Sequence, residues 1–581
     1  MKRCTKCNRA ESDDSLAYCR ADGTLLVSGG NFVSEGAGTL RFGSTPDTGE
    51  TETRILPTGE EPGRPTAPTT VLEGRRHSGD TRGLSKPKSR RVIVVVAAAI
   101  LAAAAAMYAY YRLALKSGAA VNSIAVLPFA NASGDPNVEY LSDGISESLI
   151  NSLSQLPGVK VMARGTTFSF KGKDIDPRRV GQELGVDAVL SGRVVQRGDS
   201  LTIQTDLVNV SDGSQMWGER YNRTLTDLLE VQKEIARDVL NKLRARLSPA
   251  EEQSLSKGST QNAEAYRLYL TGRYLLNNGT PEGLQRSISY FRQAVDLDPS
   301  FALGYAGMAD AYTLLGTTAP ATMPPRKAMP EARSSAQRAL EIDSGLSEAH
   351  TSLAWVNYRF DWDWRGAEGE FKRALELNPN NAQAHQWYSD YLLAMGRFDE
   401  SMAEIKRARE LDPLSLFINW SVGRALYFER RYDEALAETL KTLEMNPNFA
   451  RTYVYLTEIY LLKGREDEAL TAYLKLAALT GVSPERVSAL KGTYDSAGWK
   501  AVWRKELEWA LEDSNRRHVP PLNIAVLYSR VGDKDRTLEW LGKSAEERAG
   551  TLVYLKVDQR WDFVRSDPRF ADLMRRVGLP Q

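Results

Sequence analysis

The longest apolar run in the chain lies at residues 92–111, VIVVVAAAILAAAAAMYAYY, and contains no charged residue. Arg91 precedes it and Arg112 follows it. A helix of this length spans roughly 30 Å, which is the hydrocarbon thickness of a bilayer. A buried helix of a folded domain is the alternative, because alanine is frequent in the run, but a run without a polar face has no amphipathic pattern to place on a core. The pattern therefore predicts a single transmembrane helix at 92–111.

After this run the pattern alternates between short β-prone runs and amphipathic helices. The run SIAVLPF at 123–129 is typical of a strand, and the helix that follows places Leu141 and Ile145 on one side. Two strands with alternating apolar positions are expected on either side of the turn at 197–199. Strands interleaved with helices predict a small α/β domain at 120–248.

From 262 to 581 the pattern is helical and repeats with a fixed period. The motifs LNP, LDP and MNP end at Pro379, Pro413 and Pro447, which are 34 residues apart. This is the period of the tetratricopeptide repeat, in which each unit is a pair of helices. We therefore predict a tetratricopeptide α-solenoid over 262–581, in which the C-terminal residues cover the apolar face of the last repeat as a cap.

Composition divides the chain at the apolar run. Residues 27–91 are rich in Thr, Gly, Pro and Glu, and such a segment cannot bury enough apolar surface to offset the entropy of ordering. All eleven tryptophans follow the run, whereas all three cysteines precede it. The predicted fold class is therefore multidomain and mainly α, with a tetratricopeptide α-solenoid, a small α/β domain, one transmembrane helix and a disordered linker at 27–91.

The charges that flank the run predict its orientation. Basic residues are concentrated at 75–91, whereas only Arg112 and Lys116 follow closely. The positive-inside rule then places the N-terminus in the cytoplasm and the domains after the run on the other side of the membrane.

The three cysteines indicate a metal site near the N-terminus. Cys4 and Cys7 have the spacing of a zinc knuckle, Cys19 follows, and Asp22 stands where a fourth cysteine would be expected. Residues 1–26 resemble the short zinc-ribbon heads of many bacterial multidomain proteins, which implies zinc as cofactor and these four residues as ligands. Water or a second chain in the fourth position, or a hairpin with free thiols, are the alternatives. A module of this size has almost no core, so we expect it to fold only with the metal.

The segment SIAVLPFANASGDPNVEYLSDGISESLINSLSQLPGVKVMAR, together with ELGVDAVLSGRV and MWGERYN, resembles the TolB amino-terminal-like domain. Bacteria place that domain between a membrane anchor and tetratricopeptide repeats. The resemblance therefore implies a single-pass protein of the inner (cytoplasmic) membrane, with the C-terminal domains periplasmic or extracellular. It implies an architecture rather than an activity, because the domain has no agreed catalytic role.

Tetratricopeptide arrays bind peptides or proteins on the concave face formed by the first helix of each repeat. The resemblance to this family assigns eight positions to that face: Asp310, Trp355, Gln386, Asp390, Trp420, Arg424, Tyr427 and Glu458. Trp, Arg and Tyr are residue types that anchor interfaces. Packing between repeats is the alternative role for each position. The Lys and Asn set that clamps a C-terminal carboxylate in some family members is absent here, so a terminal carboxylate is not the expected ligand.

Charge and motifs exclude several other functions. The 75 Lys and Arg nearly balance the 74 Asp and Glu, which argues against a nucleic-acid partner. The histidines are scattered, and His385 falls where the repeat family tolerates bulky packing residues, so its expected role is structural. The sequence GKS at 542–544 lies in a helical pattern and lacks the first glycine of a phosphate loop. We therefore predict that the protein is not an enzyme.

Two functions fit these patterns. The first is a non-catalytic, membrane-anchored interaction scaffold that binds a protein or peptide through extracytoplasmic repeats. The second is a transmembrane signalling or regulatory protein, in which exterior binding changes what the zinc-ribbon-like head contacts. Neither the identity of the partner nor the oligomeric state follows from the sequence.

Overall fold

The computed structural model describes residues 2–4, 10–11, 26–28, 107, 121–156, 158–243, 260–317 and 323–580. The chain divides into two compact units, Met1–Ile93 and Val94–Gln581. In the first unit, the short strands β1 (Lys2–Cys4), β2 (Ala10–Glu11) and β3 (Leu26–Ser28) form an antiparallel sheet with β1 at its centre. The rest of the predicted head and linker lies outside the described residues.

The predicted membrane span requires a correction. Among the described residues, no helix is long and apolar enough to cross a bilayer. The long helices α10 (Pro325–Ile342) and α19 (Pro484–Ser514) carry charged residues along their length and bury only part of their surface on neighbouring helices. The predicted fold class and the predicted inner-membrane localisation, which both include such a span, are corrected accordingly: the described chain is a mainly helical repeat array with a small sheet domain. Of the predicted segment 92–111, only Met107 belongs to the described residues.

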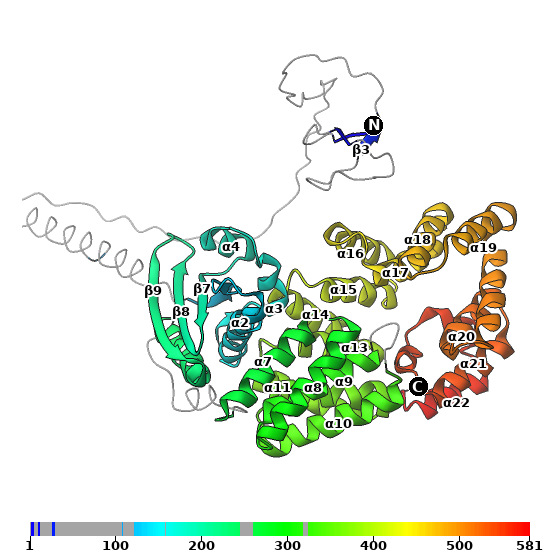
Figure 1. Ribbon diagram of the computed structural model, residues 1–581. Helices are drawn as coiled ribbons and strands as arrows, with labels where there is room; N and C mark the ends of the chain where they lie inside the picture. Colours follow the sequence, from blue (N-terminus) through cyan, green and yellow to red (C-terminus); the bar gives the residue numbers. More distant parts are fainter. Residues whose placement is uncertain are drawn as a thin grey trace, which may run out of the picture. The chain divides into compact units, whose positions relative to one another are not determined.

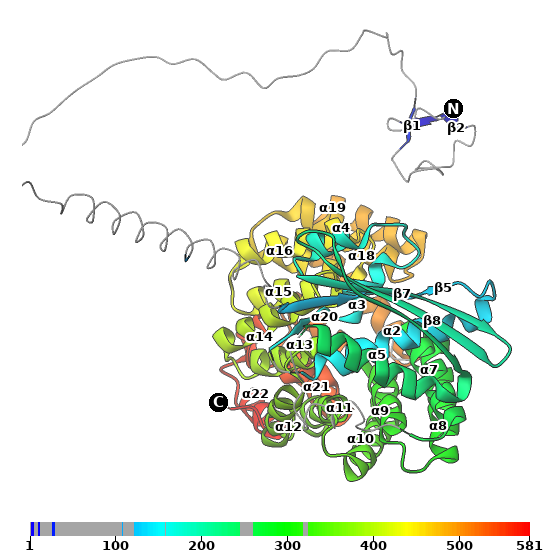
Figure 2. The same cartoon turned by 90° about the vertical axis from the view of Figure 1, so that its left-hand side faces the viewer.

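The second unit begins with the sheet domain (Figures 1 and 2). Its elements are, in chain order, β4 (Ser123–Val126), β5 (Ala130–Asn131), η1 (Pro136–Val138), α2 (Glu139–Ser154), β6 (Lys160–Val161), α3 (Arg164–Thr167), η2 (Phe168–Phe170), α4 (Pro177–Leu184), β7 (Ala188–Arg197), β8 (Ser200–Asn209), β9 (Gln215–Thr224), η3 (Leu225–Asp227) and α5 (Leu228–Leu243). The sheet order is β6-β4-β7-β8-β9, with β5 also pairing with β7. The pairs that β4 makes are parallel, and β7, β8 and β9 form an antiparallel meander.

Alternation along β4 explains why helices cover both faces of this sheet. Successive side chains of a strand point to opposite faces. Ile124 and Val126 lie in the same hydrophobic cluster as residues of α2 and α5, whereas Ala125 and Leu127 lie in a second cluster with Val180 of α4. Figure 2 shows α4 on one side of the strands and α2 and α5 on the other. The sheet is thus the middle layer of three.

The repeat array consists of helix pairs. The first and second helices of successive pairs are α7 (Ala263–Asn277) and α8 (Pro281–Leu297), α9 (Ala302–Thr317) and α10, α11 (Ser347–Val356) and α12 (Trp364–Leu377), α13 (Ala382–Ala394) and α14 (Phe398–Leu411), α15 (Leu416–Phe428) and α16 (Tyr432–Met445), and α17 (Ala450–Leu462) and α18 (Glu466–Leu479). A π-helical turn, η4 (Asn357–Asp361), extends α11. The first helices of successive pairs contact each other, α11 with α13, α13 with α15 and α15 with α17.

Small residues allow the two helices of a pair to approach closely. The Ser389 hydroxyl of α13 donates to the carbonyl oxygen of Ser401 in α14 at 2.8 Å. At the equivalent position of the next pair, a Cβ on Gly423 would lie 2.8 Å from the Thr439 hydroxyl oxygen. A larger side chain at either position would separate the helices, so this contact enforces the 34-residue period.

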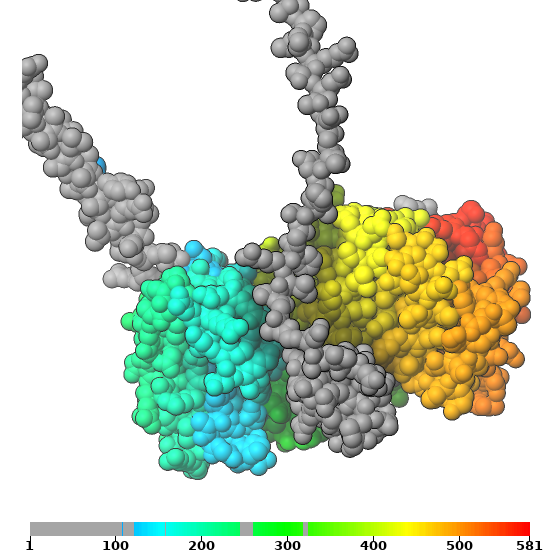
Figure 3. Space-filling model, turned by 90° about the horizontal axis from the view of Figure 1, so that it is seen from above, coloured from blue at the N-terminus to red at the C-terminus, as the bar shows by residue number. Residues whose placement is uncertain are grey.

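The C-terminal elements turn back towards the middle of the array (Figure 1), and Figure 3 shows their surface, in red, beside that of the later repeats in yellow and orange. They are α19, α20 (Pro521–Val531), α21 (Lys534–Glu546), η5 (Gly550–Tyr554), η6 (Gln559–Val564) and α22 (Pro568–Arg576). Helix α19 is bent at Gly498, whose φ of 68° interrupts the helical conformation. The Trp364 indole N–H of α12 donates to the carbonyl oxygen of Val577 at 2.9 Å. The C-terminal residues contact α21 and also reach repeats that lie far earlier in the sequence, and the predicted cap stays a prediction.

Candidate functional site

The eight positions predicted for the concave face lie on first helices of the array. Asp310 is on α9, Trp355 on α11, Gln386 and Asp390 on α13, Trp420, Arg424 and Tyr427 on α15, and Glu458 on α17. Asp390, Arg424 and Glu458 occupy the same position in three successive repeats, since they are 34 residues apart. Whether these residues bind a partner stays a prediction.

The charged members of this set pair within the chain. Arg424 forms an ion pair with Asp390 in which both side chains are only 6% exposed. Burial raises the pKa of Asp390 above its ordinary value, because Arg424 offsets only part of the cost of desolvation. Glu458 pairs with Arg530 of α20. These three side chains therefore hold the array together before any partner binds.

The aromatic members lie in two groups of ring contacts, one around Trp355 and one around Tyr455. The Trp355 ring lies 4.3 Å from that of Trp387, and Trp420 lies 5.9 Å from Tyr455, with distances between ring centroids. Tyr427 is buried and lies 5.0 Å from Tyr455. Trp420 is only half-buried, and its indole N–H donates to the Arg451 carbonyl oxygen at 3.2 Å. Of these tryptophans, Trp420 is the one whose ring remains accessible to a partner.

The polar member Gln386 links neighbouring repeats. Its side-chain amide donates to the hydroxyl of Ser421 on α15 at 3.3 Å. This contact is between adjacent first helices and stabilises their register.

The C-terminal segment, residues 548–565, occupies part of the concave face. The Tyr554 ring stacks on Phe428 of α15 at 5.2 Å with an interplanar angle of 18°. Tyr554 and Val557 belong to the same hydrophobic cluster as Trp355. The Tyr432 hydroxyl donates to the Gln559 side-chain oxygen at 3.0 Å. A part of the predicted binding face is thus filled by the chain itself.

Two arginines on this face were not singled out in the sequence. The Arg359 guanidinium lies 5.0 Å from the Trp355 ring and 5.5 Å from the Tyr554 ring, and its Nε and one terminal nitrogen are buried without a hydrogen-bond partner. Arg451 lies 5.5 Å from the Phe417 ring and 5.8 Å from the Trp420 ring. Within the described chain, neither arginine forms an ion pair, and the sequence offers no signal for this because pairing depends on the fold.

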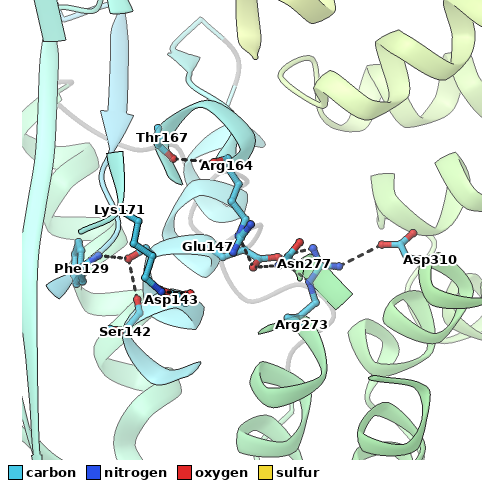
Figure 4. Close-up of polar contacts among 11 residues, drawn as sticks. Phe129, Ser142, Asp143, Glu147, Arg164, Thr167, Lys171, Arg273, Asn277 and Asp310 are labelled. Carbon is cyan, nitrogen blue, oxygen red and sulfur yellow. Dashed lines mark hydrogen bonds and ion pairs between the residues drawn. The ribbon is translucent and has the colours of Figure 1, made fainter. Parts of the chain in front are cut away.

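A second candidate site joins the sheet domain to the array (Figure 4). Glu147 of α2 accepts hydrogen bonds from Arg273 Nε at 2.8 Å and from the Asn277 amide at 2.6 Å, both on α7. It also lies 3.1 Å from Arg164 Nε. Arg273 reaches further to Asp310 at 3.2 Å. Burial by itself raises the pKa of Glu147, but the charges of Arg273 and Arg164 outweigh it, so this pKa lies below its ordinary value.

The contact between the sheet domain and the array, which we call the seam, continues along the array through further hydrogen bonds. The Asn380 side-chain amide donates to the carbonyl oxygens of Ser154 at 3.0 Å and Val159 at 2.9 Å. The Thr166 hydroxyl donates to Asp412 at 2.6 Å. A polar cavity of about 210 Å³ lies in the seam, and its lining includes Glu147, Arg164, Arg273, Glu348, Asn378 and Asn380. The sheet domain is therefore held by several successive repeats rather than by a single contact.

Two histidines of the array, His350 and His385, have structural roles. The Nδ1 of His350 is hydrogen-bonded to Glu370, and the Nδ1 of His385 lies 2.5 Å from Glu404, so each histidine joins the first helix of a pair to the second. The structural role predicted for His385 is confirmed. Within the residues that the structure describes, no group of three or more His, Cys, Asp or Glu is arranged to hold a metal ion.

The predicted zinc ligands lie outside the described residues, apart from the backbone of Cys4 at the end of β1. The zinc site therefore stays a prediction. Metal analysis of the purified full chain is expected to find about one equivalent of zinc, which the Cys4→Ser variant loses because a tetrahedral site needs its thiolates. The matched control is a chain with His77→Ser, a change outside the predicted ligand set. Zinc absent from the unaltered chain would contradict the prediction.

Comparisons with known families agree with part of this picture. Residues 363–416 and 423–484 match tetratricopeptide repeat models, which confirms the repeat prediction. Residues 120–238 match the model described as the second domain of HilA/YgeH-like transcriptional regulators. The resemblance of the sheet domain to a TolB amino-terminal-like domain stays a prediction.

Curated relatives share about half of this chain. Putative adenylate cyclase 3 of Rhizobium meliloti (strain 1021) is 34% identical over 288 residues, which cover 48% of this chain and 41% of the relative. The transcriptional regulator HilA of Salmonella typhimurium is 23% identical over 284 residues, covering 48% of this chain and 49% of the relative. The chain thus spans about half or less of the length of these relatives. The tetratricopeptide fold is typically non-catalytic, although one relative is named a cyclase.

Solved structures of repeat proteins resemble the array. The Thermus thermophilus protein TTC0263, described as a thermophilic tetratricopeptide protein, has a TM-score of 0.29 and 19% identity, covering 34% of this chain and 99% of that protein. YrrB, described as a tetratricopeptide protein with an unusual peptide-binding site, has a TM-score of 0.25 and 20% identity, covering 35% of this chain and 97% of YrrB.

Proposed function

We propose that the protein is a non-catalytic interaction scaffold that binds a protein or peptide segment on the concave face of its tetratricopeptide array. The observation that supports this most directly is the accessible aromatic surface near the start of α15. Trp420 is half-buried, and Phe417, one turn earlier on α15, is 49% exposed. A Trp with a neighbouring exposed aromatic and an arginine is the composition that anchors interfaces. Its position beyond the part filled by the C-terminal segment leaves it open to a partner.

Peptide binding by the full chain tests this proposal. We expect a subset of an immobilised library of 15-residue peptides to bind, and the Trp420→Ala variant to weaken that binding about tenfold or more, as loss of an interface anchor does. Trp540→Ala is the matched control, because Trp540 is also half-buried but lies on α21, outside the concave face. Fluorescence polarisation with the selected peptides measures both affinities. Equal weakening by the two substitutions, or no binding at all, would contradict the proposal.

A second function is favoured by the seam between the sheet domain and the array. The buried ion pairs around Glu147 connect the sheet domain to the helices α7 and α9, so binding along the array has a physical route to the sheet domain. Relatives that match 48% of the chain are named as a transcriptional regulator and a putative cyclase. The two domains would then act together as a regulatory module that controls the rest of the chain.

A further inference from the structure

We propose that the concave face recognises an acidic stretch within its peptide partner, through the arginine cluster formed by Arg359, Arg424 and Arg451 together with Trp420 and Phe417. This inference rests on the proposed peptide-binding function and specifies the chemistry of the ligand.

The first argument is the charge balance of the cluster. Arg424 is paired with Asp390, whose charge also acts on Arg359, but neither Arg359 nor Arg451 forms an ion pair of its own among the described residues. The three guanidinium groups are close enough to affect one another: after burial, the charges of Arg424 and Arg359 are what lower the pKa of Arg451. The nearby Glu458 is already used by Arg530. The cluster therefore carries more positive than negative charge, in a partly desolvated place where a negative partner is strongly attracted.

The second argument is that most buried polar groups without a hydrogen-bond partner here are N–H donors; the hydroxyls of Tyr427 and Tyr554 are further such groups. Buried polar atoms without a hydrogen-bond partner include Arg359 Nε and a terminal nitrogen, Arg424 Nε, and the indole nitrogen of Trp355. Each is an N–H group, so only an acceptor can satisfy it. Buried polar groups normally have a hydrogen-bond partner, so a cluster of buried N–H groups without one indicates that an acceptor binds there. Carboxylate oxygens supply acceptors and negative charge together.

The third argument is the surface that leads to the cluster. Arg451 lies against the rings of Phe417 and Trp420, and Arg424 lies 4.4 Å from the Trp420 ring. Leu414, near the start of the same helix, is 37% exposed beside Phe417. An acidic side chain that reaches the arginines would place neighbouring apolar side chains of the peptide on this aromatic and aliphatic surface. The Tyr554 ring lies 5.5 Å from the guanidinium groups of Arg359 and Arg424 and covers that side of the cluster, so the peptide approaches from the Arg451 side.

The ligand is a stretch of internal acidic residues and not a chain terminus. The residues that clamp a terminal carboxylate in some tetratricopeptide proteins are absent from these positions. The arginines come from three different elements, η4, α15 and α17, and are therefore spread along the array. A row of cations suits successive acidic side chains of an extended peptide better than a single charge at its end.

The test uses the full chain and three fluorescein-labelled 12-residue peptides with blocked ends, in which Leu alternates with Glu, Gln or Lys. We expect the Glu peptide to bind at least tenfold more tightly than the Gln peptide, and the Lys peptide to bind least. Arg451→Gln is expected to weaken binding of the Glu peptide about tenfold through loss of a charge-assisted hydrogen bond. Arg451→Lys, which keeps the charge, restores part of the affinity. Arg407→Gln on α14 is the matched control, since this arginine pairs with Glu410 on a second helix and should leave affinity unchanged.

The results separate this inference from the function on which it rests. Equal affinity for the Glu and Gln peptides, or an Arg451→Gln variant that binds the Glu peptide like the unaltered chain, would overturn the acidic preference. If Gln or Lys peptides still bind in a Trp420-dependent way, the peptide-binding function stands and only the preference is wrong. If no peptide of any charge binds, both fail. Arg359→Gln provides a second variant should Arg451→Gln unfold, and the same tenfold loss is expected from it.

Discussion

Replacing Arg424 with methionine is expected to lower the free energy of unfolding by about 3–5 kcal/mol, because Asp390 would remain buried without a counter-charge. Both side chains are almost fully buried, so water cannot replace the lost partner. Guanidinium unfolding followed by tryptophan fluorescence measures this change, since tryptophans line the array around the pair. Arg431→Met is the matched control: Arg431 pairs with Glu434 on an exposed surface and should contribute no more than about 1 kcal/mol.

The double variant Asp390→Leu with Arg424→Met shows what the pair itself contributes. Burial raises the pKa of Asp390, whereas the charge of Asp390 outweighs burial and raises the pKa of Arg424, so the two shifts do not by themselves give the net energy of the pair. Buried ion pairs in general repay little more than the cost of desolvating their members. Apolar residues of similar volume should therefore recover most of the stability that the single replacement loses. A double variant as unstable as the single one would show that the pair has a net stabilising role. A single variant that loses less than about 1 kcal/mol would show that Asp390 is solvated.

The repeat array could be predicted because its constraints are local. The close approach at Ser389 and Gly423 requires small residues at a fixed interval, and the helix pairs follow from that interval. The same spacing placed Asp390 and Arg424 at equivalent positions of adjacent repeats. Equivalent positions of adjacent first helices face each other, so opposite charges there pair with each other, and this pairing could have been inferred before the structure was known.

The return of the C-terminal segment could not be predicted from the sequence. The stacking of Tyr554 on Phe428 joins elements more than a hundred residues apart, and no periodicity relates them. The bend at Gly498 that redirects the chain lies in a stretch whose helical pattern continues on both sides. Ion pairing also depends on contacts between distant elements, so the sequence does not show that Arg359 and Arg451 form no ion pair. The net charge of the whole chain is close to zero, and it does not indicate which arginines lack a carboxylate in an ion pair.

In the sheet domain, too, local structure could be predicted from the sequence, whereas long-range contacts could not. The β-prone run at 123–129 predicted a strand, and the structure shows β4 there, with helices covering both faces of its sheet. Its attachment to the array depends instead on Asn380, which belongs to a turn that ends a repeat and donates to two carbonyl oxygens of the sheet domain. The motif LNPNN marked the end of a repeat in the sequence, and only the fold shows that its asparagines also hold the neighbouring domain.

Glu147→Gln is expected to loosen this attachment and to lower the free energy of unfolding by about 3 kcal/mol or more, because Arg164 and Arg273 would lose their shared buried carboxylate. Hydrogen exchange measured by mass spectrometry should show reduced protection in α2 and α7, which face each other across the seam. Glu264→Gln is the matched control, since Glu264 pairs with Arg267 on the exposed side of α7 and should leave protection unchanged.

The acid dependence of stability separates a charge effect at Glu147 from a packing effect. The pKa of Glu147 in the folded chain lies below the ordinary value of 4.5, so its contribution is complete above that value and is lost as the pH falls through the lower folded-state pKa. The Gln variant lacks this group, and its difference from the unaltered chain should shrink as the solution is acidified below pH 4.5. A difference that stays constant in acid would assign the loss to packing. In that case the seam would transmit no charge-dependent signal between the array and the sheet domain, and the regulatory function would lose its physical basis.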